Sequence, residues 1–142
     1  MEYHNIIVAV DGSEEAEHAF KKAVEIAKRN EARLIVTHVV DSRTFATAEA
    51  YDRTLAERAE NYAKELIDDY IENAKSAGLT DLIRCVEYGS PKVKITKEIA
   101  KDYNADLIIC GATGRNAVER FLIGSVSESI TRYAKCDVLV IR

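Results

Sequence analysis

The chain has 142 residues, enough for one domain whose hydrophobic core needs no metal or disulfide to support it. Hydrophobic residues make up 47% of the sequence and charged residues 31%, and the formal net charge is −4. This balance is ordinary for a globular protein and argues against general binding to nucleic acid or to acidic membranes. The three cysteines form no C-x-x-C pair, and no apolar run approaches the roughly 18 residues that span a bilayer, so we expect a reduced protein in the cytoplasm.

The first half of the chain alternates between apolar runs and helical patterns. Residues 6–10 are continuously apolar, which is typical of a strand covered on both faces. Ser13 follows as a natural helix N-cap, and nearby glutamates favour the first turn of a helix that reaches about Arg29. A second apolar run predicts a strand over 34–40, and apolar residues at three- and four-residue intervals then predict a long helix over 48–77.

The second half continues the alternation. Residues 81–88 predict a weaker strand, interrupted by charged side chains as an edge strand often is. Pro91, the only proline, stands at the first position of a helix expected over 91–103. A buried strand over 105–110, a glycine-bearing loop, a short helix and a final strand over 137–141 complete the chain.

Five strands alternating with four helices imply one α/β domain over residues 1–142, an open five-stranded parallel sheet with helices on both faces. The edge-like third strand fits the strand order 3-2-1-4-5. In such sheets, ligands bind beyond the carboxyl ends of the strands at the point where the strand order reverses. Strands 1 and 4 would be neighbours there, so we expect Asp11 and the loop that starts at Gly111 to flank a crevice.

The loop after the fourth expected strand has the most informative pattern in the chain. Gly111 and Gly114 are followed, after a nine-residue spacer, by Gly124 and Ser125 at the start of a helix. In this context main-chain N–H groups and the positive end of the helix dipole can converge on a phosphate. The glycines permit close approaches that a Cβ would hinder, and Ser125 and Ser127 add hydroxyl donors. The alternative is that these glycines only form turns.

The spacing Gly-x2-Gly-x9-Gly-Ser, placed before the last helix and strand, resembles the ATP-binding signature of the universal stress protein family. The strand ending in Asp11-Gly12-Ser13 and the segment 37–41 match the family's first and second strand ends, so the resemblance covers essentially the whole chain. It implies an adenine nucleotide alpha hydrolase-like fold that binds ATP, with or without Mg²⁺. Val39 and Val126 enter the site through this resemblance, and both would make their contacts through the main chain.

The expected nucleotide-binding set lies at the strand ends and around the glycine motif: Asp11, Val39, Gly111, Thr113, Gly114, Arg115, Gly124, Ser125, Val126 and Ser127. Several members have a purely structural alternative. Asp11 can bind ribose hydroxyls, an adenine amino group or a metal, or it can only cap the first helix. Val39 can be an ordinary core residue, and Arg115 can be a solvated surface residue instead of a phosphate ligand. The histidines show no metal-ligand spacing, so we expect no metal centre built from protein side chains alone.

Familiar enzyme signatures are missing from the sequence. There is no G-x-x-x-x-G-K-[ST] loop, no G-x-G-x-x-G after the first strand and no G-x-S-x-G elbow. Beyond Asp11, no clear carboxylate set for phosphoryl transfer is present, so no catalytic residue is expected. We expect bound ATP to act as a switch that an unidentified protein partner senses in the stress response, with little or no catalysis. The alternatives are an enzyme that hydrolyses ATP slowly or transfers its phosphoryl or adenylyl group, and an adaptor whose nucleotide loop is vestigial, against which the intact glycines argue.

The final strand suggests how copies of the chain assemble. Residues 137–141 include four consecutive apolar residues and are expected at one edge of the sheet. Such an edge invites another strand, because its main-chain groups are unpaired. The simplest closed arrangement is a two-fold homodimer in which this strand pairs with its own copy, antiparallel. The family resemblance implies the same dimer.

Overall fold

The computed structural model describes residues 2–41, 53–112 and 125–142. Five strands form one sheet in the order β3-β2-β1-β4-β5, which confirms the predicted order. All four neighbouring pairs run parallel. The strands are β1 (Asn5–Ala9), β2 (Arg33–Val40), β3 (Leu82–Tyr88), β4 (Leu107–Gly111) and β5 (Asp137–Ile141).

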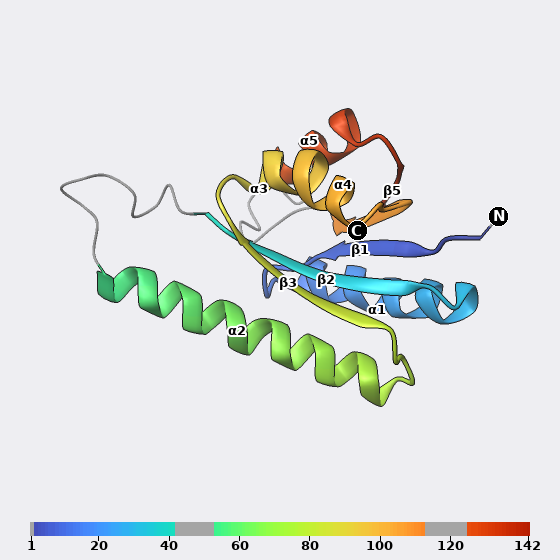
Figure 1. Cartoon of the computed structure of the whole chain (residues 1–142), viewed down its shortest axis with the longest axis horizontal. Coiled ribbons are helices and arrows are strands. Elements are labelled where there is room, and N and C mark those ends of the chain that lie inside the picture. Colours follow the sequence, from blue (N-terminus) through green and yellow to red (C-terminus); the bar gives the residue numbers. More distant parts are fainter. Residues whose placement is uncertain (1, 42–52, 113–124) are drawn as a thin grey trace.

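The helices cover both faces of this sheet. Helices α1 and α2 lie on one face, and α3, α4 and α5 lie on the other (Figure 1). Their bounds are α1 (Glu14–Asn30), α2 (Arg53–Ser76), α3 (Pro91–Val93), α4 (Ala100–Asp102) and α5 (Ser125–Tyr133), with the π-helix η2 (Lys94–Ile99) between α3 and α4. The sandwich of helices around a parallel sheet is therefore the predicted architecture.

Local sequence signals account for the helix ends. Ser13 Oγ accepts a hydrogen bond from Ala16 N at 3.1 Å, so the predicted N-cap of α1 is confirmed. After α2, Gly78 adopts a φ of +103°, a left-handed conformation that suits glycine and ends the helix. The first residues of the predicted long helix, 48–52, lie outside the described part of the chain. The helix predicted over 91–103 is present, but its middle is the wider η2, which an apolar repeat does not distinguish from an α-helix.

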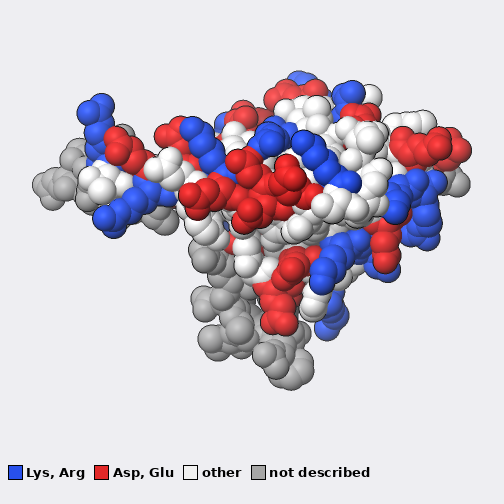
Figure 2. Space-filling view, turned by 90° about the horizontal axis from the view of Figure 1, so that it is seen from below, with Lys and Arg blue, Asp and Glu red and all other residues white. Residues whose placement is uncertain are grey.

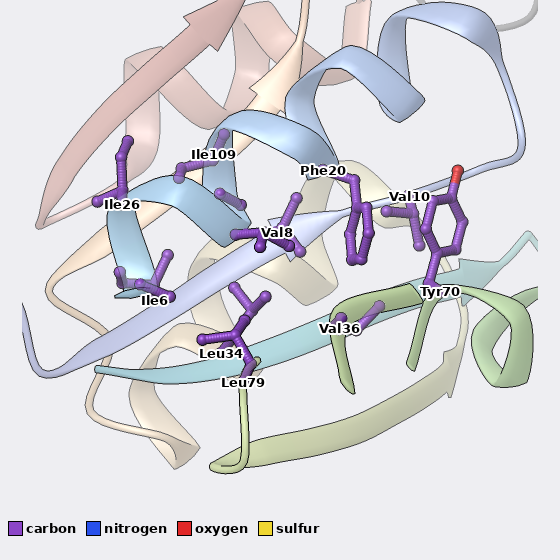
Figure 3. Packing of buried hydrophobic residues seen from close by; sticks show 14 of the residues in the cluster. Ile6, Val8, Val10, Phe20, Ile26, Leu34, Val36, Tyr70, Leu79 and Ile109 are labelled. Carbon is purple, nitrogen blue, oxygen red and sulfur yellow. The ribbon is translucent and has the colours of Figure 1, made fainter. Parts of the chain in front are cut away.

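Alternating strand residues divide the core between the two faces. Ile6 and Val8 of β1 pack with α1 and α2, whereas Ile7 packs with the helices of the opposite face. On the first face Phe20 of α1 and Tyr70 of α2 meet with ring centroids 4.7 Å apart (Figure 3). Burying each large apolar side chain contributes about 1.5–3 kcal/mol to stability. The core clusters on the two faces of the sheet therefore hold the strand ends in fixed positions.

The outer face of α1 and α2 carries charges of both signs. Acidic and basic side chains are interspersed over it (Figure 2). In the part of the chain that the structure describes, this face offers no uniformly basic surface of the kind that binds nucleic acid. Within the same described ranges, no helix is both long and apolar enough to cross a membrane.

Candidate functional site

The carboxyl ends of β1 and β4 lie side by side, as the strand order requires. These two strands pair in parallel from Ile6 with Leu107 to Val8 with Ile109, so their carboxyl ends lie at the same end of the sheet. Asp11 follows β1 closely, and Gly111 is the last residue of β4. The chain order thus reverses between β1 and β4, at the position where open parallel sheets bind ligands.

Asp11 shapes the turn between β1 and α1. Its Oδ1 accepts a hydrogen bond from Ser13 N at 2.9 Å, and Ser13 in turn caps α1. The helix is therefore capped by Ser13, and Asp11 closes the turn before it. A carboxylate can accept several hydrogen bonds, so this contact leaves Asp11 with capacity for a ligand donor.

Val39 presents its main chain beside the end of β1. Odd-numbered residues of β2 direct their N–H and C=O groups toward β1: Arg33 N donates to His4 O at 2.8 Å, and Thr37 O accepts from Val10 N at 2.9 Å. Val39 has the same parity and lies two residues beyond Thr37, past the carboxyl end of β1. Its side chain is buried in the core. Both sequence interpretations of Val39 are therefore compatible with its position.

Gly111 allows the end of β4 and the first turn of α1 to approach closely. A Cβ on this residue would lie 3.0 Å from the main-chain carbon, the main-chain oxygen and the Cβ of Glu15 in the first turn of α1. The absence of a side chain at Gly111 therefore allows the first turn of α1 to pack on the end of β4. This packing gives a structural reason for the glycine, and the approach of a phosphate to Gly111 stays a prediction.

The first turn of α5 is attached to the end of β4. Ser127 is 5% exposed, and its hydroxyl donates to the main-chain oxygen of Gly111. The N–H groups of residues 125–127 begin the helix and have no carbonyl partner within it, and N–H groups at a helix start are of the kind that binds anions. The Ser127 hydroxyl is already used to hold α5 against β4. Its contribution to a ligand would thus come from its main-chain N–H.

Cys110 lies beneath this attachment. Burial raises the pKa of its thiol, and a hydrogen bond with Ser127 opposes part of that rise. A thiol kept protonated in this way is a poor nucleophile. The residue therefore supports the floor of the site and supplies no reactive group.

Four expected site residues lie outside the described part of the chain: Thr113, Gly114, Arg115 and Gly124. The residues that the structure brings to the carboxyl edge of the sheet are Asp11, Val39 and Gly111, with Ser125, Val126 and Ser127 at the start of α5. Among the described residues, no group of three or more histidine, cysteine, aspartate or glutamate side chains is arranged to hold a metal ion.

Sequence reasoning missed three aromatic side chains beside the β1–α1 turn. His38 lies 2.8 Å from Val10 O, and Tyr62 lies 3.5 Å from Asp11 O. Burial raises the pKa of Tyr70 to about 12, Asp11 and Glu17 add to the rise, and the Gly12 N–H lowers it. Tyr62 and Tyr70 belong to the apolar repeat that predicts the long helix, but a helical repeat carries no information about which loop a side chain reaches.

Comparisons with known proteins agree on one family. The profile of the universal stress protein family matches residues 2–142. A putative universal stress protein of Staphylococcus aureus strain USA300 is 54% identical over 140 residues, covering 99% of this chain and 84% of that relative. The structure of UspA from Lactobacillus plantarum is 36% identical with a TM-score of 0.89, covering 100% of this chain and 99% of that one. A universal stress protein solved in complex with cAMP is 26% identical with a TM-score of 0.77, covering 100% and 99%. The chain belongs to the universal stress protein family.

Proposed function

We propose that this protein binds ATP beyond the carboxyl ends of β1, β2 and β4 and acts as a nucleotide-dependent switch in a stress response. The observation that carries the proposal is the attachment of α5 to β4. The Ser127 hydroxyl bonded to Gly111 O holds the first turn of α5, whose main-chain N–H groups have no carbonyl partner within the helix, beside the end of β4. A helix start held in this position is suited to a phosphate group.

The remaining site residues suggest how the nucleotide lies. The main chain of Val39 faces the space past β1 and would contact the adenine edge, while Asp11 would accept hydrogen bonds from ribose hydroxyls. The phosphates would extend toward residues 111–115 and 124–127, with Thr113, Gly114, Arg115 and Gly124 completing the cradle. If Mg²⁺ accompanies ATP, the phosphate oxygens and Asp11 are its natural ligands, because Mg²⁺ prefers oxygen.

The related protein in complex with cAMP supports an adenine nucleotide as the class of ligand. The choice of ATP within that class rests on the glycine spacing, which offers donors on both sides of a nine-residue connection and so suits a long phosphate chain. Binding ATP more tightly in one conformation than in another is sufficient for a switch that a protein partner senses. Slow ATP hydrolysis is the competing function, and measured turnover of a contaminant-free preparation separates the two.

A homodimer through β5 is part of the proposal. Ile141 O accepts from Ala112 N at 2.7 Å, so the odd-numbered residues of β5 direct their main-chain groups toward β4. Val138 and Val140 have the opposite parity and direct theirs to the outer edge of the sheet. An antiparallel copy of β5 would pair these groups and remove the open edge.

Calorimetric titration with ATP tests the site, using Gly114→Val. We expect ATP affinity to be lost, because the added side chain occupies the space that a phosphate must enter. Thr131→Val on the exposed face of α5 is the matched control, and it should bind as the unmodified protein does. Circular dichroism verifies that both variants are folded. Unchanged ATP affinity in a folded Gly114→Val variant rejects the site.

A further inference from the structure

Side chains from two other elements hold the main chain of the β1–α1 turn. The ring of His38 on β2 lies with Nδ1 2.8 Å from Val10 O; because a carbonyl oxygen only accepts, this nitrogen carries the hydrogen. The Tyr62 hydroxyl on α2 lies 3.5 Å from Asp11 O. The two rings meet edge to face, with centroids 6.2 Å apart and an angle of 73°. His38 and Tyr62 therefore form one unit, here called the aromatic bracket, under residues 10–12.

The turn itself is shaped to fit this bracket. Gly12 has a φ of +83°, and a Cβ there would lie 2.6 Å from the Tyr62 hydroxyl and 3.3 Å from Leu66 Cδ1. The turn thus rests directly on α2 at a residue that only glycine suits. Tyr70 lies two turns further along the same helix, and its hydroxyl points toward the β1–α1 connection (Figure 3). Side chains of α2 consequently support the turn at more than one point.

We propose that Tyr62 is a positioning residue that sets the affinity of the site for the adenosine part of a nucleotide by holding the Asp11 turn. The inference rests on the nucleotide site proposed above. Asp11 would contact the ribose, and its carboxylate direction depends on a main chain that His38 and Tyr62 hold from below. Tyr62 belongs to α2, which packs on β2 and β3, so the ribose end of the site is coupled to the position of that helix.

Through this coupling the position of α2 regulates the affinity of the site for nucleotide. If nucleotide binding favours the bracketed position of the turn, then it also favours the position of α2 that forms the bracket. The reverse holds by the same factor, because coupling between two binding events is reciprocal. A protein partner that displaces α2 would therefore weaken nucleotide binding, and bound nucleotide would weaken that partner.

The test compares Tyr62→Ala with Tyr133→Ala in titrations with ATP and with inorganic tripolyphosphate. Tyr62 is 40% exposed and Tyr133 is 56% exposed at the end of α5, so neither substitution removes a core residue. We expect Tyr62→Ala to weaken ATP binding about three- to tenfold, the equivalent of one hydrogen bond, and to leave tripolyphosphate binding unchanged. Tyr62→Phe keeps the ring but removes the hydroxyl that reaches Asp11 O, so it should weaken ATP binding to a similar extent and also leave tripolyphosphate binding unchanged. Tyr133→Ala should match the unmodified protein with both ligands.

Two results overturn the inference: ATP affinity unchanged in Tyr62→Ala, or equal losses for ATP and tripolyphosphate, which indicate general damage. If the unmodified protein binds neither ligand, the proposed function fails, and the bracket is then judged without nucleotide. Amide hydrogen exchange over residues 10–13 should be faster in Tyr62→Ala than in Tyr133→Ala. Equal exchange rates show that the aromatic bracket does not hold the turn.

Discussion

Replacing Ser127 with alanine should loosen the start of α5 and reduce stability. The side chain is 5% exposed and donates to Gly111 O, so the substitution removes a buried hydrogen bond and leaves a carbonyl oxygen without that donor. Losing such a partner costs about 1–3 kcal/mol. Ser129→Ala on the same helix is the control. Alanine has a more favourable helix propensity than serine by roughly 0.5 kcal/mol, and both variants gain this contribution equally.

Urea denaturation followed by circular dichroism measures the difference. We expect a lower midpoint for Ser127→Ala than for Ser129→Ala at an unchanged m-value, which indicates a change in stability and not in the unfolded state. ATP affinity should fall as well, since the N–H groups of residues 125–127 lose their fixed direction. Equal midpoints for the two variants would refute the reasoning that the Ser127 hydroxyl attaches α5 to β4.

Three further outcomes are expected. Asp11→Ala should weaken ATP binding by about 1.5–3 kcal/mol, because it removes a charged hydrogen-bonding group, and the loss should be larger than for Asp41→Ala. Equal dissociation constants of the two variants in calorimetry would contradict the assigned geometry. If the proposed dimer forms, Val140→Pro should convert it to a monomer in light scattering with its circular dichroism retained, because the substitution deletes an outward-facing donor. A stable monomer of the unmodified chain at about 10⁻⁵ M would contradict the proposed dimer. Because the pKa of Tyr70 is about 12 in the folded protein against 10.0 for a free phenol, the unfolded state releases its proton first and stability falls as the pH rises from 10 toward 12. Tyr70→Phe should lose less stability over that interval, and an identical pH profile in urea denaturation would count against this assignment.

Much of the fold could be predicted because its signals are local. The apolar runs that form β1 and β4 are continuous and the run of β2 is nearly so, as strands covered on both faces require, and the interrupted run of β3 indicated an edge. Ser13 as an N-cap and Gly78 as a helix stop depend on neighbouring main-chain groups alone. From these elements the parallel sheet and its strand order followed.

The roles of individual side chains at that edge depended on contacts between distant parts of the chain. The sequence predicts that Gly111 leaves room for a phosphate, and only the packed structure shows that Glu15 of α1 also lies against it. The sequence predicts the Ser127 hydroxyl as a donor to a ligand, whereas in the structure this hydroxyl donates to Gly111 O. In both cases the residue type indicated a special position, and the neighbour that explains it came from another element.

The sequence by itself determined the elements and their order in the sheet, because hydrogen bonding and apolar periodicity within each segment encode them. Only the tertiary structure decided that His38 and Tyr62 support the Asp11 turn and that Val140 directs its main chain outward. Tyr62 and Asp11 are separated by 51 residues, and such a contact exists only after α2 has packed against the sheet. Likewise, which residues of β5 direct their main-chain N–H and C=O groups outward is fixed only once β5 has paired with β4 in its observed register.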